Sequence, residues 1–115
     1  MKTSELTGAA LDWAVAKAEG HDVDDPTWWP DFGDESCYST DWQQGGPIIE
    51  REGISLTSYL DEEDSYWIGS VECQYRDFNA TAYYEECGPT PLIAAMRCYV
   101  ASMLGDEVDV PEELQ

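Results

Sequence analysis

One short segment near the middle of the chain brings hydroxyl, carboxylate, amide and indole groups together, and its sequence is Ser39-Thr40-Asp41-Trp42-Gln43-Gln44-Gly45-Gly46-Pro47. Small-molecule sites are built from such parts, an aromatic surface plus a few convergent polar groups. Trp42 could stack on a base, Thr40 and Asp41 could hold a ribose, and Arg51 could meet an anionic group of the same ligand. The structural alternative is an Asp or Ser cap on a turn, with the Trp side chain in the core.

Residue types that support catalysis or metal binding are scattered along the chain. The four cysteines form no C-x-x-C pair, and the only histidine is His21. Zinc sites use close ligand pairs, and a nucleophilic thiol needs a cationic neighbour that lowers its pKa. His21 precedes an acidic stretch, and Cys98 falls within an apolar one. We therefore expect no enzymatic activity, no metal and no cofactor, with reduced thiols in a reducing compartment.

The net charge is extreme for a chain that has the composition of a folded protein. Among 115 residues, 25 are Asp or Glu and five are Lys or Arg, for a formal charge of −20, yet 43% are hydrophobic. Disordered acidic tails lack such apolar content. Nucleic-acid binding requires clustered Lys and Arg, and a membrane span requires about 18 consecutive apolar residues. We therefore expect no direct nucleic-acid partner and no membrane partner.

The N-terminal half is expected to hold a helix and a long loop within a single domain, residues 1–115. Thr3 or Ser4 can cap a helix over about residues 5–19, which ends at Gly20. Asp12 and Glu19 lie outside its apolar stripe, so we expect this helix to cover a sheet. Residues 21–46 contain seven acidic residues and the Trp28-Trp29 pair, and are expected to form an ordered acidic loop.

Residues 47–84 have the pattern of short strands. Isoleucines on either side of Gly53 predict a hairpin or bulge at Arg51–Gly53. Asp61–Asp64 is an expected turn, Trp67 and Val71 share one face of the next strand, and a third strand is expected over residues 78–84.

The C-terminal part has the clearest local signals. Thr90 is a suitable N-cap, Pro91 suits the first helical position and Gly105 ends a helix over residues 91–104. The acidic tail, residues 106–115, is expected to form a short edge strand. Together these elements predict an α+β fold, with an antiparallel sheet of about four strands, an N-terminal helix and a buried C-terminal helix.

The C-terminal helix is apolar all round, so we expect it to be buried on more than one side. In so small a domain, one of those sides is expected to face a second subunit. The interface would then include Met96, Tyr99 and Met103, and the protein would be a homo-oligomer.

Three blocks of the sequence resemble the phage protein NinX family. They are residues 3–13, residues 38–54, which run from Tyr38 through Thr40-Asp41-Trp42 to Ile54, and residues 88–100, which open with Gly88-Pro89-Thr90-Pro91. Family members commonly carry extra Pro and Ser residues between the Tyr and the Thr-Asp-Trp, and this chain has a shorter turn there. The resemblance implies a temperate-phage accessory protein that works in the host bacterial cytoplasm and has no assigned function.

The layout also has a fainter similarity to small phage sponge proteins that sequester cyclic nucleotide immune signals. The shared features are an N-terminal helix, a following antiparallel sheet and a Ser/Thr-Asp motif near a Trp, and this is an analogy of layout. It implies that Thr40, Asp41, Trp42 and Arg51 would lie nearest a ligand.

Three functions remain open from the sequence. The first is a non-catalytic counter-defence protein that binds a cyclic nucleotide or an ADP-ribose-type molecule in an oligomeric pocket. The second is an acidic DNA mimic that inhibits a host DNA-binding defence protein, with the charge itself as the active feature. The third is a scaffold partner of another phage protein that binds no ligand.

Overall fold

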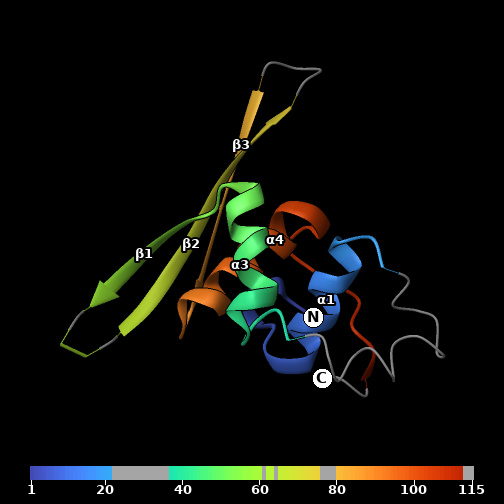
Figure 1. Ribbon diagram of the computed structural model, residues 1–115, viewed down its shortest axis with the longest axis horizontal. Coiled ribbons are helices and arrows are strands. Elements are labelled where there is room, and N and C mark those ends of the chain that lie inside the picture. Colours follow the sequence, from blue (N-terminus) through green and yellow to red (C-terminus); the bar gives the residue numbers. More distant parts are fainter. Residues whose placement is uncertain (22–36, 61, 64, 76–79, 113–115) are drawn as a thin grey trace.

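The computed structural model describes residues 1–21, 37–60, 62–63, 65–75 and 80–112. It shows an α+β fold in which the helices lie on one side of a three-stranded antiparallel sheet (Figure 1). This confirms the predicted fold class, with three strands in the described residues in place of about four. The elements in chain order are a 3-10 turn η1 (Thr3–Glu5), α1 (Gly8–Ala18), α3 (Trp42–Glu52), β1 (Ser55–Leu60), β2 (Ser65–Tyr75), β3 (Ala80–Gly88) and α4 (Pro91–Leu104).

Helix α4 begins and ends where its local signals predict. The Thr90 hydroxyl accepts a hydrogen bond from the Ile93 N–H at 3.1 Å, and Pro91 occupies the first turn, where its missing N–H costs nothing. The helix ends before Gly105, whose φ of +95° lies outside the range that other residues readily adopt. The prediction for residues 91–104 is confirmed.

The sheet has the order β1-β2-β3, with each strand antiparallel to the next. Helix α4 packs directly against it at two glycines that face the helix. A Cβ atom at Gly69 would lie 2.7 Å from the Ala94 carbonyl oxygen, and one at Gly88 would lie 2.7 Å from the Ala94 nitrogen. The close approach therefore requires glycine at both positions. Because side chains alternate along a strand, Tyr66, Ser70 and Glu72 point to the opposite side of the sheet.

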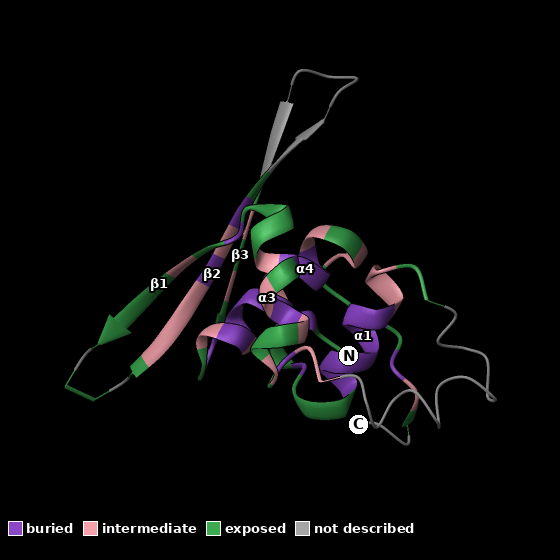
Figure 2. Cartoon of the chain, viewed as in Figure 1, coloured by how far each residue is buried: buried purple, intermediate pink, exposed green. Residues whose placement is uncertain are grey.

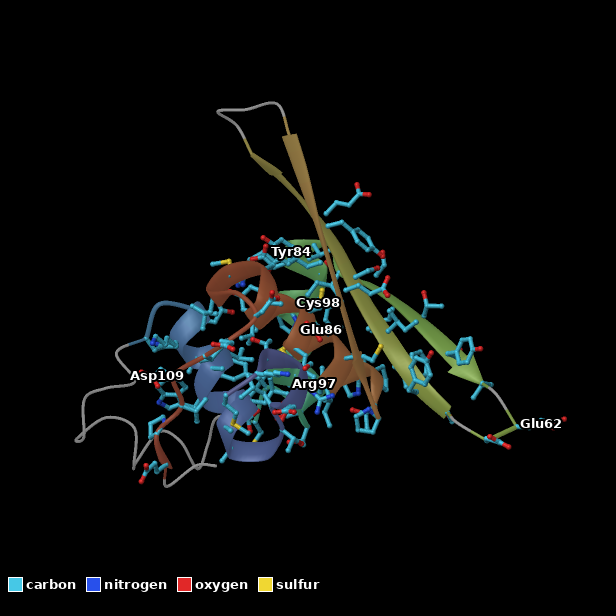
Figure 3. The ribbon with its side chains drawn as sticks, turned by 180° about the vertical axis from the view of Figure 1, so that it is seen from behind. Glu62, Tyr84, Glu86, Arg97, Cys98 and Asp109 are labelled. Carbon is cyan, nitrogen blue, oxygen red and sulfur yellow. The ribbon has the colours of Figure 1, made fainter. Side chains whose placement is uncertain are left out.

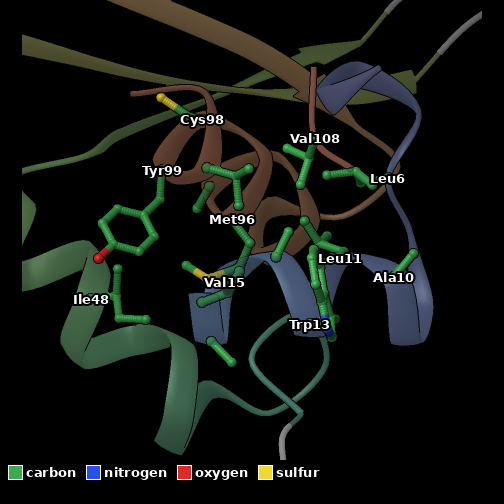
Figure 4. Packing of buried hydrophobic residues seen from close by; sticks show 14 of the residues in the cluster. Leu6, Ala10, Leu11, Trp13, Val15, Ile48, Met96, Cys98, Tyr99 and Val108 are labelled. Atoms are coloured by element: carbon green, nitrogen blue, oxygen red, sulfur yellow. The ribbon is translucent and has the colours of Figure 1, made fainter. Parts of the chain in front are cut away.

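Helix α4 is the centre of the core, and elements of the same chain surround it. It contacts all three strands on one side and α1, α3 and η1 on the others. Buried side chains from these elements meet between the layers, and Figure 4 shows Leu11, Trp13, Ile48 and Met96 among them. The apolar character of α4 is thus explained within one subunit. This removes the reason for placing a second subunit on the helix.

The N-terminal helix differs from its prediction in length and in partner. Residues 3–5 form η1, and α1 begins only at Gly8, whose φ of +56° interrupts the helical path. Its buried face packs on α4, so it does not serve as a direct cover for the sheet. Asp12 was expected outside the buried stripe but is only 8% exposed. It is accommodated because both the N–H and the hydroxyl of Ser39 donate to its Oδ1, at 2.9 and 2.8 Å.

The hairpin or bulge predicted at Arg51–Gly53 is wrong, and so are the predicted loop at residues 42–46 and the predicted strand at residues 47–52, because residues 42–52 form helix α3. The Asp41 side chain caps its start, and Gly53 ends it with a φ of +69°. Gly45 packs against the Tyr38 carbonyl and the Leu92 side chain, and Ile48 is 2% exposed in the core. Caps at both ends and burial of one face therefore outweigh the glycines and proline inside the helix.

Strand β3 extends four residues further along the chain than predicted, to Gly88. The described part of the tail, residues 106–112, forms no strand of the sheet. Lys2 and Glu107 form an isolated antiparallel bridge, and the Val108 N–H donates to the Met1 carbonyl at 2.9 Å. The predicted turn at 61–64, the Trp28-Trp29 pair and Phe78 fall wholly or partly outside the described residues.

Candidate functional site

Three of the residues predicted to bind a ligand lie together at the start of α3. The Asp41 Oδ1 accepts the Gln43 N–H at 2.9 Å, so Asp41 is the N-cap of this helix. Thr40 is exposed, and Trp42 is 53% exposed. The structural alternative is therefore correct for the Asp cap, but the Trp side chain is outside the core.

Arg51, the fourth predicted residue, lies in the last turn of the same helix. A rise of 1.5 Å per residue separates it from Trp42 by about 13 Å along the axis. Its guanidinium forms ion pairs with Glu19 at 3.0 Å and with Glu52 at 3.1 Å. The hydrogen bond that Arg51 donates to Glu19 is the main reason that the Arg51 pKa is raised. The structure thus does not bring the four residues together, and the Arg51 charge is already engaged.

The same ion pair joins three helices. The Tyr99 hydroxyl donates to Glu19 Oε2 at 3.3 Å and accepts from Arg51 Nη2 at 3.3 Å. Burial is the main cause that raises the pKa of Tyr99 to about 12, and the negative charge of Glu19 adds to it. Tyr99 and Met96 are 2% and 0% exposed within the monomer, so neither is available as the predicted subunit interface. Met103 is 53% exposed.

A hollow of about 450 Å³ lies beside strand β3, and we call it the β3 hollow. Its walls bring together two carboxylates, a phenol, a thiol, a hydroxyl and a guanidinium, from Ser4, Tyr66, Glu85, Glu86, Cys87 and Arg97, with Gly88 and Pro89 completing the lining. Figure 3 shows Glu86 and Arg97 close to each other beside β3 and α4. Carboxylates beside an aromatic ring are a setting that favours a cationic group.

The one cation in this lining is held by the protein itself. The Arg97 Nε donates to the Leu6 carbonyl at 2.7 Å and Nη1 donates to the Cys87 carbonyl at 2.8 Å. Burial lowers the Arg97 pKa, while Glu86 acts in the opposite direction. Burial raises the pKa of the Glu86 carboxyl, Asp106 raises it further, and Arg97 opposes both. Arg97 is thus half-buried and pinned to the backbone between η1 and β3.

A second hollow of about 390 Å³, the β2 hollow, lies around the start of β1 and the neighbouring part of β2. Two carboxylates, two hydroxyls and a phenol line it, from Glu52, Ser55, Ser70, Glu72 and Tyr83, together with Gly53 and Val71. The Tyr83 hydroxyl donates to Glu85 Oε2 at 2.9 Å, so a hydrogen bond links the linings of the two hollows. Both hollows are acidic and partly aromatic, and both open beside the sheet.

Strand β1 differs from its neighbours because its sequence, SLTSYL, has no charged residue. Strand β2 carries Glu72, and β3 carries Glu85 and Glu86. Figure 2 shows that β1 is largely exposed. Within the described part of the chain, no three His, Cys, Asp or Glu residues are grouped so that they could hold a metal ion.

Sequence reasoning did not find the two hollows. The β3 hollow is built from η1, β2, β3 and α4, which are far apart in the chain. No short sequence motif predicts that these distant segments come together in the fold. The only signal available was the scarcity of cations, which singled out Arg97 as one of five basic residues.

The model of the family described as Bacteriophage P22, NinX matches residues 2–103. The chain belongs to the NinX family. Comparison with the curated proteins gives no match. The match spans all the helices and strands apart from the end of α4, and it includes both hollows. In the described residues of this NinX protein, no helix combines the length and the apolar character needed to cross a membrane.

Proposed function

We propose that this NinX protein is a non-catalytic phage accessory protein that binds a basic protein surface, of the kind that host DNA-binding proteins use to hold DNA. The observation that carries the proposal is the β3 hollow, whose lining contains the Glu85 and Glu86 carboxylates, from opposite faces of β3, and the Tyr66 ring, and would receive a guanidinium or ammonium group. The one cation in the lining of this hollow, Arg97, already donates hydrogen bonds to two backbone carbonyls. In the host cytoplasm, such a surface would present carboxylates where DNA presents phosphates.

The electrostatics of the whole chain support this proposal. A net charge of −20 attracts a basic partner over about one Debye length, roughly 8 Å at physiological salt. Of the described cations, Arg51 is paired with Glu19 and Glu52, and Arg97 is bound to carbonyl oxygens. These pairings leave neither guanidinium for a ligand phosphate. The geometry thus favours an acidic mimic over the sequestration of a cyclic nucleotide or an ADP-ribose derivative.

Binding of an arginine nonapeptide tests the receptor directly. We expect Glu85→Gln/Glu86→Gln to weaken binding about tenfold or more, since it removes both carboxylates of the β3 hollow. The matched control is Glu50→Gln/Glu112→Gln, which changes the net charge equally at exposed positions outside both hollows. Calorimetry at low salt measures both. Equal losses in the two variants would show that only net charge matters, and would overturn the assignment of the hollow.

The DNA-mimic function needs a second experiment. Host proteins retained on DNA-cellulose are challenged with the wild type and with the two double variants. We expect the wild type and the control to release a defined set of DNA-binding proteins in complex with the NinX chain, and the hollow variant to release much less. Release of nothing by the wild type, or a thermal shift with cyclic nucleotides or ADP-ribose that is lost in Trp42→Ala, would favour the scaffold or the nucleotide hypothesis instead.

A further inference from the structure

Strand β1 forms an open edge of the sheet and lacks the usual protection against pairing. Among the strands of the described residues its partner is β2, so its other edge faces away from the described sheet. Proteins usually protect such edges with Lys, Pro, inward-pointing charges or a bulge. The sequence of β1 contains no charged residue and no proline, and its register with β2 is continuous over all six positions from Ser55 to Leu60.

Two large exposed apolar side chains of the sheet lie at the end of β1, and a third, Tyr83, lies on β3. Leu60 is 78% exposed, and Tyr59 is 46% exposed. The Tyr59 ring stacks on Tyr66 of β2 with centroids 4.9 Å apart, which fixes its orientation. The β1–β2 end of the sheet extends beyond the helical layer, as Figure 1 shows. A second chain can therefore approach this edge without meeting the helices.

We propose that β1 pairs antiparallel with β1 of a second copy of this chain, so that two sheets join into one of six strands. A two-fold axis perpendicular to the sheet keeps each face continuous, and directly opposite residues must then share a face. The register centred on Ser58 meets this condition. It places Leu56 opposite the partner subunit's Leu60, and Thr57 opposite the partner subunit's Tyr59. Both pairs are of types that stabilise antiparallel strands, and they cover the exposed side chains of Tyr59 and Leu60.

The charge distribution identifies a second copy as the occupant. Two chains of −20 repel each other wherever their acidic surfaces meet, and β1 is the one strand of the described sheet that adds no charge to the contact. Acidic residues stand at both ends of the strand, with Glu52 before it and Glu62 and Glu63 after it. Antiparallel pairing brings opposite ends together, so added salt should strengthen the dimer. Docking of a basic partner would respond to salt with the opposite sign.

Sedimentation equilibrium of the full chain tests the proposal. We expect the mass to rise from 12.9 kDa toward twice that value with protein concentration, and to rise further between about 50 mM and about 500 mM NaCl. Leu60→Glu should weaken the dimer at least tenfold, because it places two carboxylates within the interface. The matched control Met103→Glu adds the same charge at an exposed residue of α4 and should leave it unchanged. A monomer at every concentration and salt, or equal effects of the two variants, would overturn the proposal.

A cross-linking pair tests the register itself. In the register centred on Ser58 the two Ser58 residues lie opposite each other, about 5 Å apart, which is within reach of a disulfide. Ser58→Cys should thus form a covalent dimer on oxidation, beyond the background of the wild-type cysteines. Ser55→Cys is the control, because that register separates the two equivalent positions by about 20 Å. Efficient cross-linking through Ser55→Cys alone would exclude this register.

Discussion

The two edges of the sheet share one neighbour but differ in charge. Strand β1 consists of uncharged residues and exposes Tyr59 and Leu60. Strand β3 carries Glu85 and Glu86, which line an acidic hollow. A net charge of −20 therefore does not mean that the acid is spread evenly over the molecule. One edge is suited to meet a basic surface, and the other is suited to meet a copy of itself.

Both edges of the sheet depend on the close packing of α4 on Gly69 and Gly88, and a change in that packing should affect both edges. Gly69→Ala places a Cβ against the Ala94 carbonyl, and we expect the free energy of unfolding to fall by about 1–3 kcal/mol. Gly46→Ala is the control, because a Cβ there meets only the edge of the Trp42 ring at 3.9 Å. It should raise stability by about 0.5–1 kcal/mol, since alanine favours a helix. Urea denaturation measures the stability of both variants, and equal stabilities would contradict the close packing of α4 against Gly69.

A change in the helical layer should lower stability while leaving the two edges distinct. Ser39→Ala removes one of the two hydrogen bonds that Asp12 accepts from residue 39, and we expect a loss of about 1–2 kcal/mol. Asp12→Asn keeps an acceptor for both donors and relieves the burial of a charge, so its stability should match or exceed the wild type. Peptide binding and sedimentation should be unchanged in both variants. A selective loss at one edge would show that the helical layer shapes that edge.

Added salt should have opposite effects on binding at the two edges of the sheet. Between about 50 mM and about 500 mM NaCl, affinity for the arginine nonapeptide is expected to fall about tenfold, because screening weakens the attraction to Glu85 and Glu86. Over the same range the dimer is expected to strengthen a few-fold, because screening weakens repulsion between the strand ends. Calorimetry and sedimentation measure the two trends. If salt weakened both peptide binding and dimerisation, the two edges would not differ in the sign of their electrostatic interactions.

Acid should reduce the difference between the edges. The folded pKa of Glu86 lies above its ordinary value of 4.5, mainly through burial. Protonation of Glu86 therefore contributes its full share of folding stability at a pH below 4.5, and this contribution is lost as the pH rises through the folded pKa. Lowering the pH from about 8 to about 5 should weaken peptide binding a few-fold and favour the dimer. Glu86→Gln should flatten the first trend, and an unchanged pH dependence in that variant would exclude Glu86 as its source.

Local signals predicted the parts of the fold that are encoded locally. Helix α4 followed from Thr90, Pro91 and Gly105, because each acts on the backbone next to it. Helix α3 was missed because Gly45-Gly46-Pro47 is typical of a loop, and the helix is favoured there by its end caps and by tertiary packing, which includes the contact of Gly45 with Leu92. The partial success at Asp41 has the same cause, since capping is local.

The site was less predictable than the fold, because it depends on which segments meet. The ligand hypothesis placed Arg51 beside Trp42, but a helix separates them, and Glu19 from a distant helix pairs with Arg51. The β3 hollow needs Ser4, Glu85 and Arg97 to converge. No spacing of residues in the sequence predicts that these three residues meet. The uncharged run of β1, in contrast, can be read directly from the sequence.

The pairing of the chain's first and last described segments has a practical consequence for rearranging the molecule. Residues 1–3 are hydrogen-bonded to residues 106–108, through Met1 to Val108 and Thr3 to Asp106. These two segments lie side by side, so a linker that joins them would cost little chain entropy. A circular permutant opened between Glu62 and Glu63 would keep each described helix and strand whole, and would turn the β1–β2 connection into a pair of attachment points.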